Sequence, residues 1–117
     1  MERFLTTSGA SDLAQFAVFR NKNARSKAVF PLLVEVQSDL LDELQTRVVI
    51  PLSKVAALTK SPVSQLTPLL EFEGVSYVLV TPQLAGIAQS ELGPATGSLA
   101  HHRSTILAAM NFLLLGF

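Results

Sequence analysis

The segment LLVEVQSDLLDELQTRVVIPLS, residues 32–53, contains two β-like runs separated by an acidic stretch. In the first run, one face of a strand would carry Leu33, Glu35 and Gln37, and the other face Leu32, Val34 and Val36. Pro31 cannot donate to a ladder, which predicts that this strand lies at a sheet edge or is bulged there. The second run, TRVVIPLS, is β-branched and is expected to end near Pro51.

The preceding run QFAVFRN, residues 15–21, predicts another strand, with Phe16, Val18 and Arg20 on one face and Ala17 and Phe19 on the other. It leads into RNKNARSK, residues 20–27, which holds four positive charges in eight residues. Such a run is typical of a solvated hairpin loop, and the alternative is a contact for an acidic partner. Residues 1–14 show no sustained period and are interpreted as a loosely ordered extension before a domain spanning residues 15–117.

Beyond residue 53 the pattern predicts a short helix, a hairpin and a long helix. SKVAALTKS indicates one or two helical turns, capped by Ser53 and stopped before Pro62. LLEFEGVSYVLVT, residues 69–81, predicts a hairpin around Glu73-Gly74, because glycine accepts positive φ. Residues 82–97 are punctuated by proline and glycine and leave room for one more short strand.

The closing segment SLAHHRSTILAAMNFLLLGF predicts the long helix, with Ser98 as its N-cap. Its apolar face would carry Leu99, Ile106, Met110, Leu113 and Phe117, widened by Leu107 and Leu114. The last turn is apolar on nearly every side, so its end is buried in the core, buried against a second copy, or presented to another protein. Strands followed by one helix make the fold class α+β, mainly β and antiparallel.

The composition excludes several classes of protein. The 117 residues fit one domain, with nine basic and nine acidic residues, 49% hydrophobic residues and no cysteine. The balanced charge argues against direct nucleic-acid binding, and the lack of cysteine excludes disulfides and thiolate metal sites. We found no signal-peptide or membrane-spanning pattern, so the cytoplasm is the expected compartment. The low charge content favours association with a partner, and the alternative is a well-filled core.

Catalytic residues are not apparent in this sequence. His101 and His102 are adjacent, so on a helix they diverge and cannot share a task, and neither has a metal-type partner at helical spacing. The carboxylates Glu35, Asp39, Asp42 and Glu43 are interpreted as a solvated face or as caps. No phosphate-binding, dinucleotide or nucleophile-elbow motif occurs. From residue chemistry alone the protein is a small α+β interaction protein with no cofactor and no metal.

A resemblance adds to this interpretation. VEVQSDLLD, residues 34–42, followed by VVIPL, residues 48–52, resembles the signature of the CcdB family, toxins of bacterial plasmid and chromosomal toxin–antitoxin modules that poison DNA gyrase. The likeness includes QF at the first strand, the hairpin at Glu73-Gly74, Gly93, and a terminal helix ending in Asn-x-x-x-x-Gly and one apolar residue. It covers roughly residues 15–117.

The resemblance implies an SH3-like barrel of bent antiparallel strands, a small extra sheet and a C-terminal helix, in a tight homodimer. It also implies that the protein does no chemistry but traps the covalent complex of gyrase with DNA, and that a CcdA-like antitoxin neutralises it. The implied gyrase-binding residues are Leu115, Gly116, Phe117, Leu114, Asn111, Ser38, Leu40 and Leu41. Dimer contacts are expected from Met110, Leu113 and Leu114, and antitoxin contacts from Arg20, Lys22, Arg25 and Lys27.

Some positions depart from the family pattern. The best-known members have tryptophan where this chain has Leu115, isoleucine where it has Phe117, and often an acidic residue where it has Arg103. Two alternatives therefore stand beside the gyrase poison. One is a non-toxic relic or decoy that only dimerises and binds antitoxin. The other is an endoribonuclease resembling the MazF/Kid toxins, which share the barrel, since fold does not fix function.

Overall fold

The computed structural model describes residues 15–38, 45–54 and 65–116. The strands are β1 (Ala17–Asn21), β2 (Leu32–Glu35), β3 (Thr46–Lys54), β4 (Leu69–Phe72), β5 (Val75–Leu79), β6 (Ala85–Ala88) and β7 (Leu92–Ser98). They form one antiparallel sheet in the order β4-β5-β3-β2-β1-β7, with β6 also paired to β3. Helix α2 (Arg103–Leu115) follows, preceded by the 3-10 turn Ala100–His102. The predicted α+β, mainly β fold class is confirmed.

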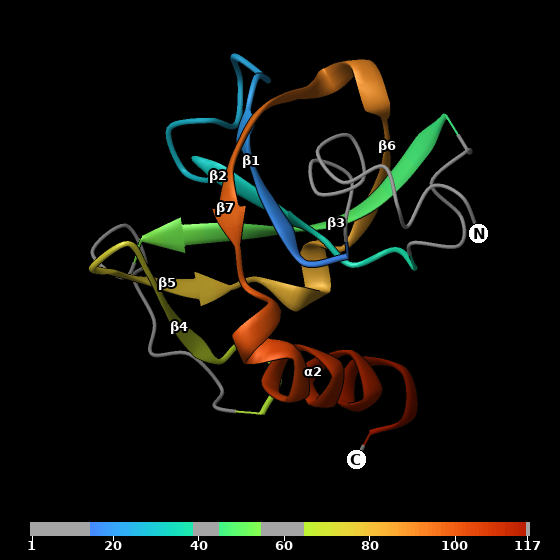
Figure 1. The fold of residues 1–117 in the computed structure, drawn as a ribbon. Helices are drawn as coiled ribbons and strands as arrows, with labels where there is room; N and C mark the ends of the chain where they lie inside the picture. The colour runs from blue at the N-terminus through green and yellow to red at the C-terminus, as the bar shows by residue number, and fades with distance from the viewer. Residues whose placement is uncertain (1–14, 39–44, 55–64, 117) are drawn as a thin grey trace, which may run out of the picture.

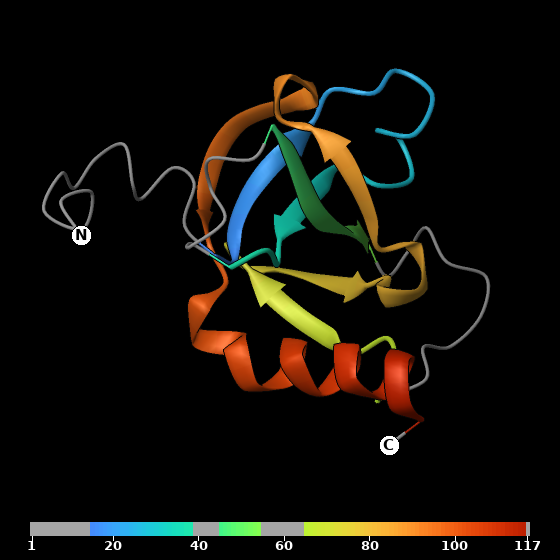
Figure 2. The same ribbon diagram turned by 90° about the vertical axis from the view of Figure 1, so that its right-hand side faces the viewer.

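The sheet is curled because β3 is long enough to pair with three strands. Its first residues pair with β6 and its last with β5, while β2 lies along its other side. Figures 1 and 2 show the strands wrapping into a half-barrel, with α2 lying across the open end below β4 and β5. The expected small extra sheet is not separate among the described residues, because the β4–β5 hairpin is continuous with the main sheet through β3.

One face of the sheet builds the main core with α2. The face predicted for Leu32, Val34 and Val36 is buried together with Phe16 and Val18. Ile106 and Ala109 of α2 are fully buried against it. Because the alternation of apolar residues matches the period of a strand, this face could be identified from the sequence.

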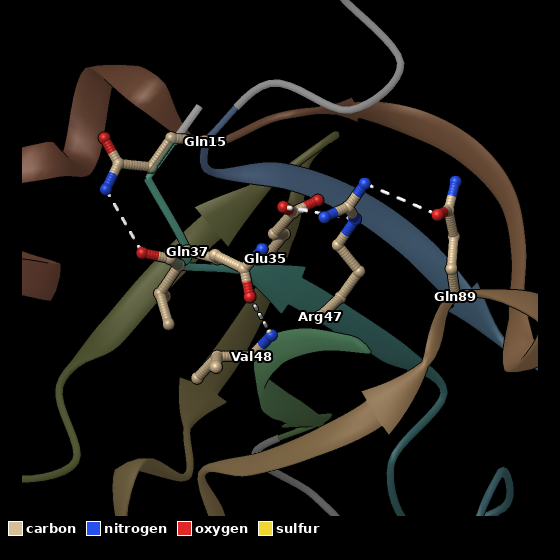
Figure 3. Close-up of polar contacts among 7 residues, drawn as sticks. Gln15, Glu35, Gln37, Arg47, Val48 and Gln89 are labelled. Carbon is tan, nitrogen blue, oxygen red and sulfur yellow. Dashed lines mark hydrogen bonds and ion pairs between the residues drawn. The ribbon is translucent and has the colours of Figure 1, made fainter. Parts of the chain in front are cut away.

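The opposite face holds a buried ion pair, which the sequence did not suggest. Glu35 and Arg47 are both fully buried, and Arg47 Nε lies 3.8 Å from Glu35 Oε2. Arg47 Nη2 also donates to Gln89 Oε1 at 3.4 Å, so the arginine ties β3 to the segment after β6. Figure 3 shows these side chains converging inside the curl of the sheet. The interpretation of Glu35 as part of a solvated face is wrong, because the sheet curls over that face.

The glutamine side chains near this pair support the backbone at the end of β2. Gln37 is buried, and its Oε1 accepts a hydrogen bond from the backbone N–H of Val48 at 3.2 Å. Gln15 Nε2 donates to the Val36 carbonyl at 3.1 Å (Figure 3). Each amide therefore satisfies a backbone group where regular pairing stops.

Several local predictions need correction. Pro31 precedes β2, which is a central strand, and its carbonyl accepts the Asn21 N–H at 3.0 Å. β3 continues past Pro51 to Lys54, so Ser53 is a buried strand residue and not a helix cap, and residues 55–62 of the predicted helix lie outside the described residues. The stretch of residues 82–97 forms two strands, β6 and most of β7. Ser98 Oγ accepts the Ala100 N–H at 3.0 Å, which leaves α2 to begin at Arg103.

The predicted hairpin at Glu73-Gly74 is confirmed. Phe72 pairs with Val75, so the loop has two residues, and both have positive φ: 53° for Glu73 and 81° for Gly74. Positive φ at both central positions defines a type I′ turn, whose twist matches that of the flanking strands. Glycine takes this conformation without cost, whereas glutamate does not.

Replacing Glu73 by asparagine is expected to stabilise the protein by about 0.5–1 kcal/mol. Asparagine tolerates the left-handed conformation and precedes glycine in the preferred type I′ sequence. Urea unfolding followed by circular dichroism would measure the gain. Glu71→Asn is the matched control, since Glu71 is exposed in β4 and asparagine is disfavoured in a strand. A less stable Glu73→Asn protein would show that the glutamate side chain itself supports the turn.

Candidate functional site

Helix α2 is anchored on one side only. Ile106 and Ala109 are fully buried, and Leu107 and Met110 are half-buried against the core. The sequence Arg103–Leu115 contains a single charged side chain, Arg103 at its start. The helix therefore has an inner face fixed by the sheet and an outer surface without charge toward its C-terminal end.

The C-terminal end of α2 exposes a group of apolar side chains. Leu113, Leu114 and Leu115 are 37%, 72% and 61% exposed. With Gly116 we name these residues the apolar tip. Fully burying a leucine side chain stabilises a protein by about 1.5–3 kcal/mol. Leucines as exposed as these do not contribute that free energy to the single chain. Of the three possibilities for this end of the chain, burial of Leu114 and Leu115 in the chain's own core is excluded.

Gly116 ends the helix in a defined way. It has φ 82°, and its N–H donates to the Phe112 carbonyl at 2.9 Å, which caps the helix in the left-handed conformation. The cap turns the chain away from the helix axis directly after the exposed leucines. The apolar tip is thus presented on a closed, ordered helix end.

The other residues predicted to bind gyrase lie in different places. Asn111 is exposed on α2, one turn before Leu115. Ser38 is half-buried at the end of the segment after β2. In Figure 2 that teal segment leaves the sheet on the left, whereas α2 ends on the right, so one chain does not bring them together. Leu40, Leu41 and Phe117 lie outside the described residues.

The run of residues 20–27, which we name the basic loop, is held in shape by two asparagines. Asn21 Nδ2 donates to Ser26 Oγ at 3.0 Å and to the Phe30 carbonyl at 2.8 Å. Asn23 Oδ1 accepts the backbone N–H groups of Arg25 and Ser26 at 2.8 and 3.2 Å. The charges of this loop are evident in the sequence but its scaffold was not predicted, although asparagines that hydrogen-bond the next residues are typical of turns.

All four predicted antitoxin-binding cations are exposed: Arg20, Lys22, Arg25 and Lys27. Lys22 Nζ donates to the Ser90 carbonyl at 3.1 Å, which joins the loop to the turn before β7. Figure 1 shows the loop (blue to cyan) at the end of the molecule opposite α2. The basic loop and the apolar tip are therefore two separate surfaces.

The part of the chain that the structure describes was searched for a metal site and for a membrane-spanning helix. His101 and His102 lie in the 3-10 turn before α2, with ring centroids 4.3 Å apart and the rings tilted by 43° to each other. Across residues 15–38, 45–54 and 65–116, no set of three or more potential ligands is arranged for a metal ion. Within the same ranges, no helix has the length and apolar character needed to cross a membrane.

The half-barrel and the apolar tip define a class: small, mainly β proteins with an exposed apolar surface at the end of one helix. A comparison with protein-family models identifies the family. The model described as CcdB protein matches residues 15–116, and the chain belongs to the CcdB family. This is a family of toxins from toxin–antitoxin modules.

Proposed function

We propose that this protein binds the gyrase A subunit and traps the covalent gyrase–DNA cleavage complex. The observation that carries the proposal is the apolar tip, where Leu114 and Leu115 are 72% and 61% exposed beside Gly116. A contiguous apolar patch without charge fits a pocket on another protein. A glycine at its end permits close approach of the partner's backbone.

The protein would act by binding and not by chemistry of its own. It would work in the bacterial cytoplasm as a homodimer, with α2 of each copy at the interface through Met110, Leu113 and Leu114. Two apolar tips related by a two-fold axis match the symmetry of a two-fold gyrase A dimer. The remaining contacts would come from Asn111, Ser38, Leu40, Leu41 and Phe117, and a CcdA-like antitoxin would bind the basic loop.

A gyrase cleavage assay tests the proposal. Purified protein is mixed with gyrase, ATP and supercoiled plasmid, and detergent and protease then release any trapped DNA. Linear DNA above the level without the protein is the expected result. A folded protein that yields only relaxed and supercoiled DNA would contradict gyrase poisoning.

Leu115 favours one second candidate, a relic that dimerises and binds antitoxin without poisoning gyrase. The family resemblance implies tryptophan at this position, and tryptophan is a typical interface hot spot worth about 2 kcal/mol or more. Leu115→Trp separates the two functions. A large gain of linear DNA from an inactive parent would identify a relic. RNA cleavage by the purified protein would instead indicate the endoribonuclease.

The proposed dimer gives a prediction for Met110, which is half-buried against the core in the single chain. Met110→Lys is expected to destabilise the protein by about 2–3 kcal/mol and to shift it toward monomer, because it places a charge on the packed face. Urea unfolding and analytical ultracentrifugation would measure both effects. Thr105→Lys, at an exposed position of α2, is the control. A Met110→Lys protein that stays stable and dimeric would place that side chain in solvent.

A further inference from the structure

A hollow of about 560 Å³ lies between the turn of the β4–β5 hairpin and the connection from β7 to α2. One side consists of Glu71, Phe72 and Glu73 from the hairpin. The other side consists of Gly97 and Ser98 at the end of β7 and of the two histidines of the 3-10 turn. The fold thus brings two segments that are far apart in the sequence together around one hollow.

The floor of the hollow depends on close packing between Gly97 and Phe72. A β-carbon at position 97 would lie 2.8 Å from Cζ of Phe72, so a residue larger than glycine would displace the ring. Phe72 is 6% exposed and belongs to the core, which fixes its position. The hollow therefore has a rigid base that includes one aromatic ring.

The hollow is negatively charged. Among its lining residues the charged side chains are Glu71 and Glu73, and both are exposed. Neither carboxylate forms an ion pair or a side-chain hydrogen bond with the described part of the chain. Arg103 follows the histidines in the sequence, but its guanidinium lies over the ring of Phe16, 6.0 Å from the centroid. Both negative charges are thus left for a cation from outside the chain.

A guanidinium group fits this set of side chains better than an ammonium group does. Its planar fork can pair with a carboxylate through two parallel N–H···O bonds, and its face stacks on aromatic rings. It has five N–H donors, and a neutral imidazole at His101 or His102 offers one acceptor nitrogen. A metal ion is disfavoured, because the described ranges contain no set of three or more ligands arranged for one.

We propose that this hollow binds the guanidinium group of an arginine carried by a partner protein. Small-molecule sites bury most of their ligand, whereas five of the seven residues that line this hollow are exposed. A side chain delivered by a protein needs no such enclosure, because contacts outside the hollow add to its binding. Glu71 and Glu73 would hold the charge, and the ring of Phe72 would support the plane of the group.

This site is separate from the proposed gyrase contact. Figure 2 shows α2 beginning on the left and ending on the right, so the hollow and the apolar tip lie at opposite ends of the helix. An arginine can therefore occupy the hollow while the apolar tip stays free, and the inference does not depend on gyrase binding.

Three peptides test the proposal. They have the sequence Gly-Ser-X-Ser-Gly with blocked ends, where X is arginine, lysine or citrulline, which has nearly the shape of arginine without its charge. Each is titrated into isotopically labelled protein while the amide signals are followed by NMR. The arginine peptide should shift the signals of Gly97, Ser98 and His101 in a saturable way, with a Kd at least threefold lower than that of the lysine peptide. The citrulline peptide should give no saturable shift.

The double variant Glu71→Gln, Glu73→Gln removes both charges with little change of shape and should weaken the arginine peptide at least fivefold. Glu91→Gln is the matched control, because Glu91 is an exposed carboxylate that does not line the hollow, and it should bind like the parent. Circular dichroism establishes that each variant is folded.

Equal affinity for the arginine and lysine peptides would overturn the proposal, as would a double variant that binds like its parent. No saturable shift up to about 10 mM arginine peptide would overturn it as well. If an arginine of a second copy fills the hollow, sedimentation equilibrium would show an association that the double variant weakens, which would rule out a different protein as the source. The titrations contain no gyrase, so their failure is distinguishable from a failure of the cleavage assay.

Discussion

Replacing Arg47 by methionine is expected to lower the free energy of unfolding by roughly 3–5 kcal/mol, a large part of the stability of a small domain. Arg47 is fully buried inside the curled sheet, with its Nε 3.8 Å from Glu35 Oε2. Methionine would fill much of the volume but leave the Glu35 carboxylate in a low-dielectric interior without the cation. It would also remove the hydrogen bond to Gln89 that holds the segment after β6.

The double variant Glu35→Leu, Arg47→Met identifies the cause of that loss. Removing both charges leaves no buried ion behind, so it should recover most of the stability lost in the single variant. Lys54→Met is the control, because Lys54 is exposed at the end of the same strand. Urea unfolding followed by circular dichroism would measure all three proteins. A single Arg47→Met variant within about 1 kcal/mol of the parent would show that the pair contributes little.

The burial of the Glu35–Arg47 pair could not be predicted from the sequence. Alternation correctly placed Val34 on the core face, and it also placed Glu35 on the opposite face. Whether that opposite face is solvated depends on how far the sheet curls, and the pairings of β6 with β3 and of β7 with β1 extend that curl. Their segment is rich in proline and glycine, so its local pattern did not predict two strands. Pairing between distant segments decides such burial, and local periodicity does not record it.

Some features of the candidate site were likewise predictable from the sequence, and others were not. The apolar end of α2 was predictable, because the leucines exceed what one helix face can bury. The start of α2 was not, because Ser98 looked like an N-cap and instead bonds the Ala100 N–H before a 3-10 turn. The hollow beside the start of α2 was missed as well. Its sides come from the β4–β5 hairpin and from the connection between β7 and α2, which only the fold brings together.

Deleting Gly116 and Phe117 is expected to abolish gyrase poisoning while leaving the fold nearly unchanged. The buried contacts of α2, through Ile106 and Ala109, lie two turns or more before the deletion, so unfolding in urea should change by less than about 1 kcal/mol. The proposed contact with gyrase would lose Gly116, which permits close approach of the partner's backbone, and Phe117, its last apolar side chain. If these act as a hot spot worth about 2 kcal/mol, at least roughly 30-fold more protein would be needed for the same yield of linear DNA.

The matched comparison for this deletion is Thr105→Lys, which changes an exposed residue at the other end of α2 and should leave cleavage unaffected. Analytical ultracentrifugation distinguishes loss of the gyrase contact from loss of the dimer, since the truncated protein is expected to sediment like its parent. Linear DNA at the parental protein concentration from a truncated dimer would remove Gly116 and Phe117 from the proposed gyrase-binding site. The remaining candidates would then be the other residues of the proposed contact: Leu114, Leu115, Asn111, Ser38, Leu40 and Leu41.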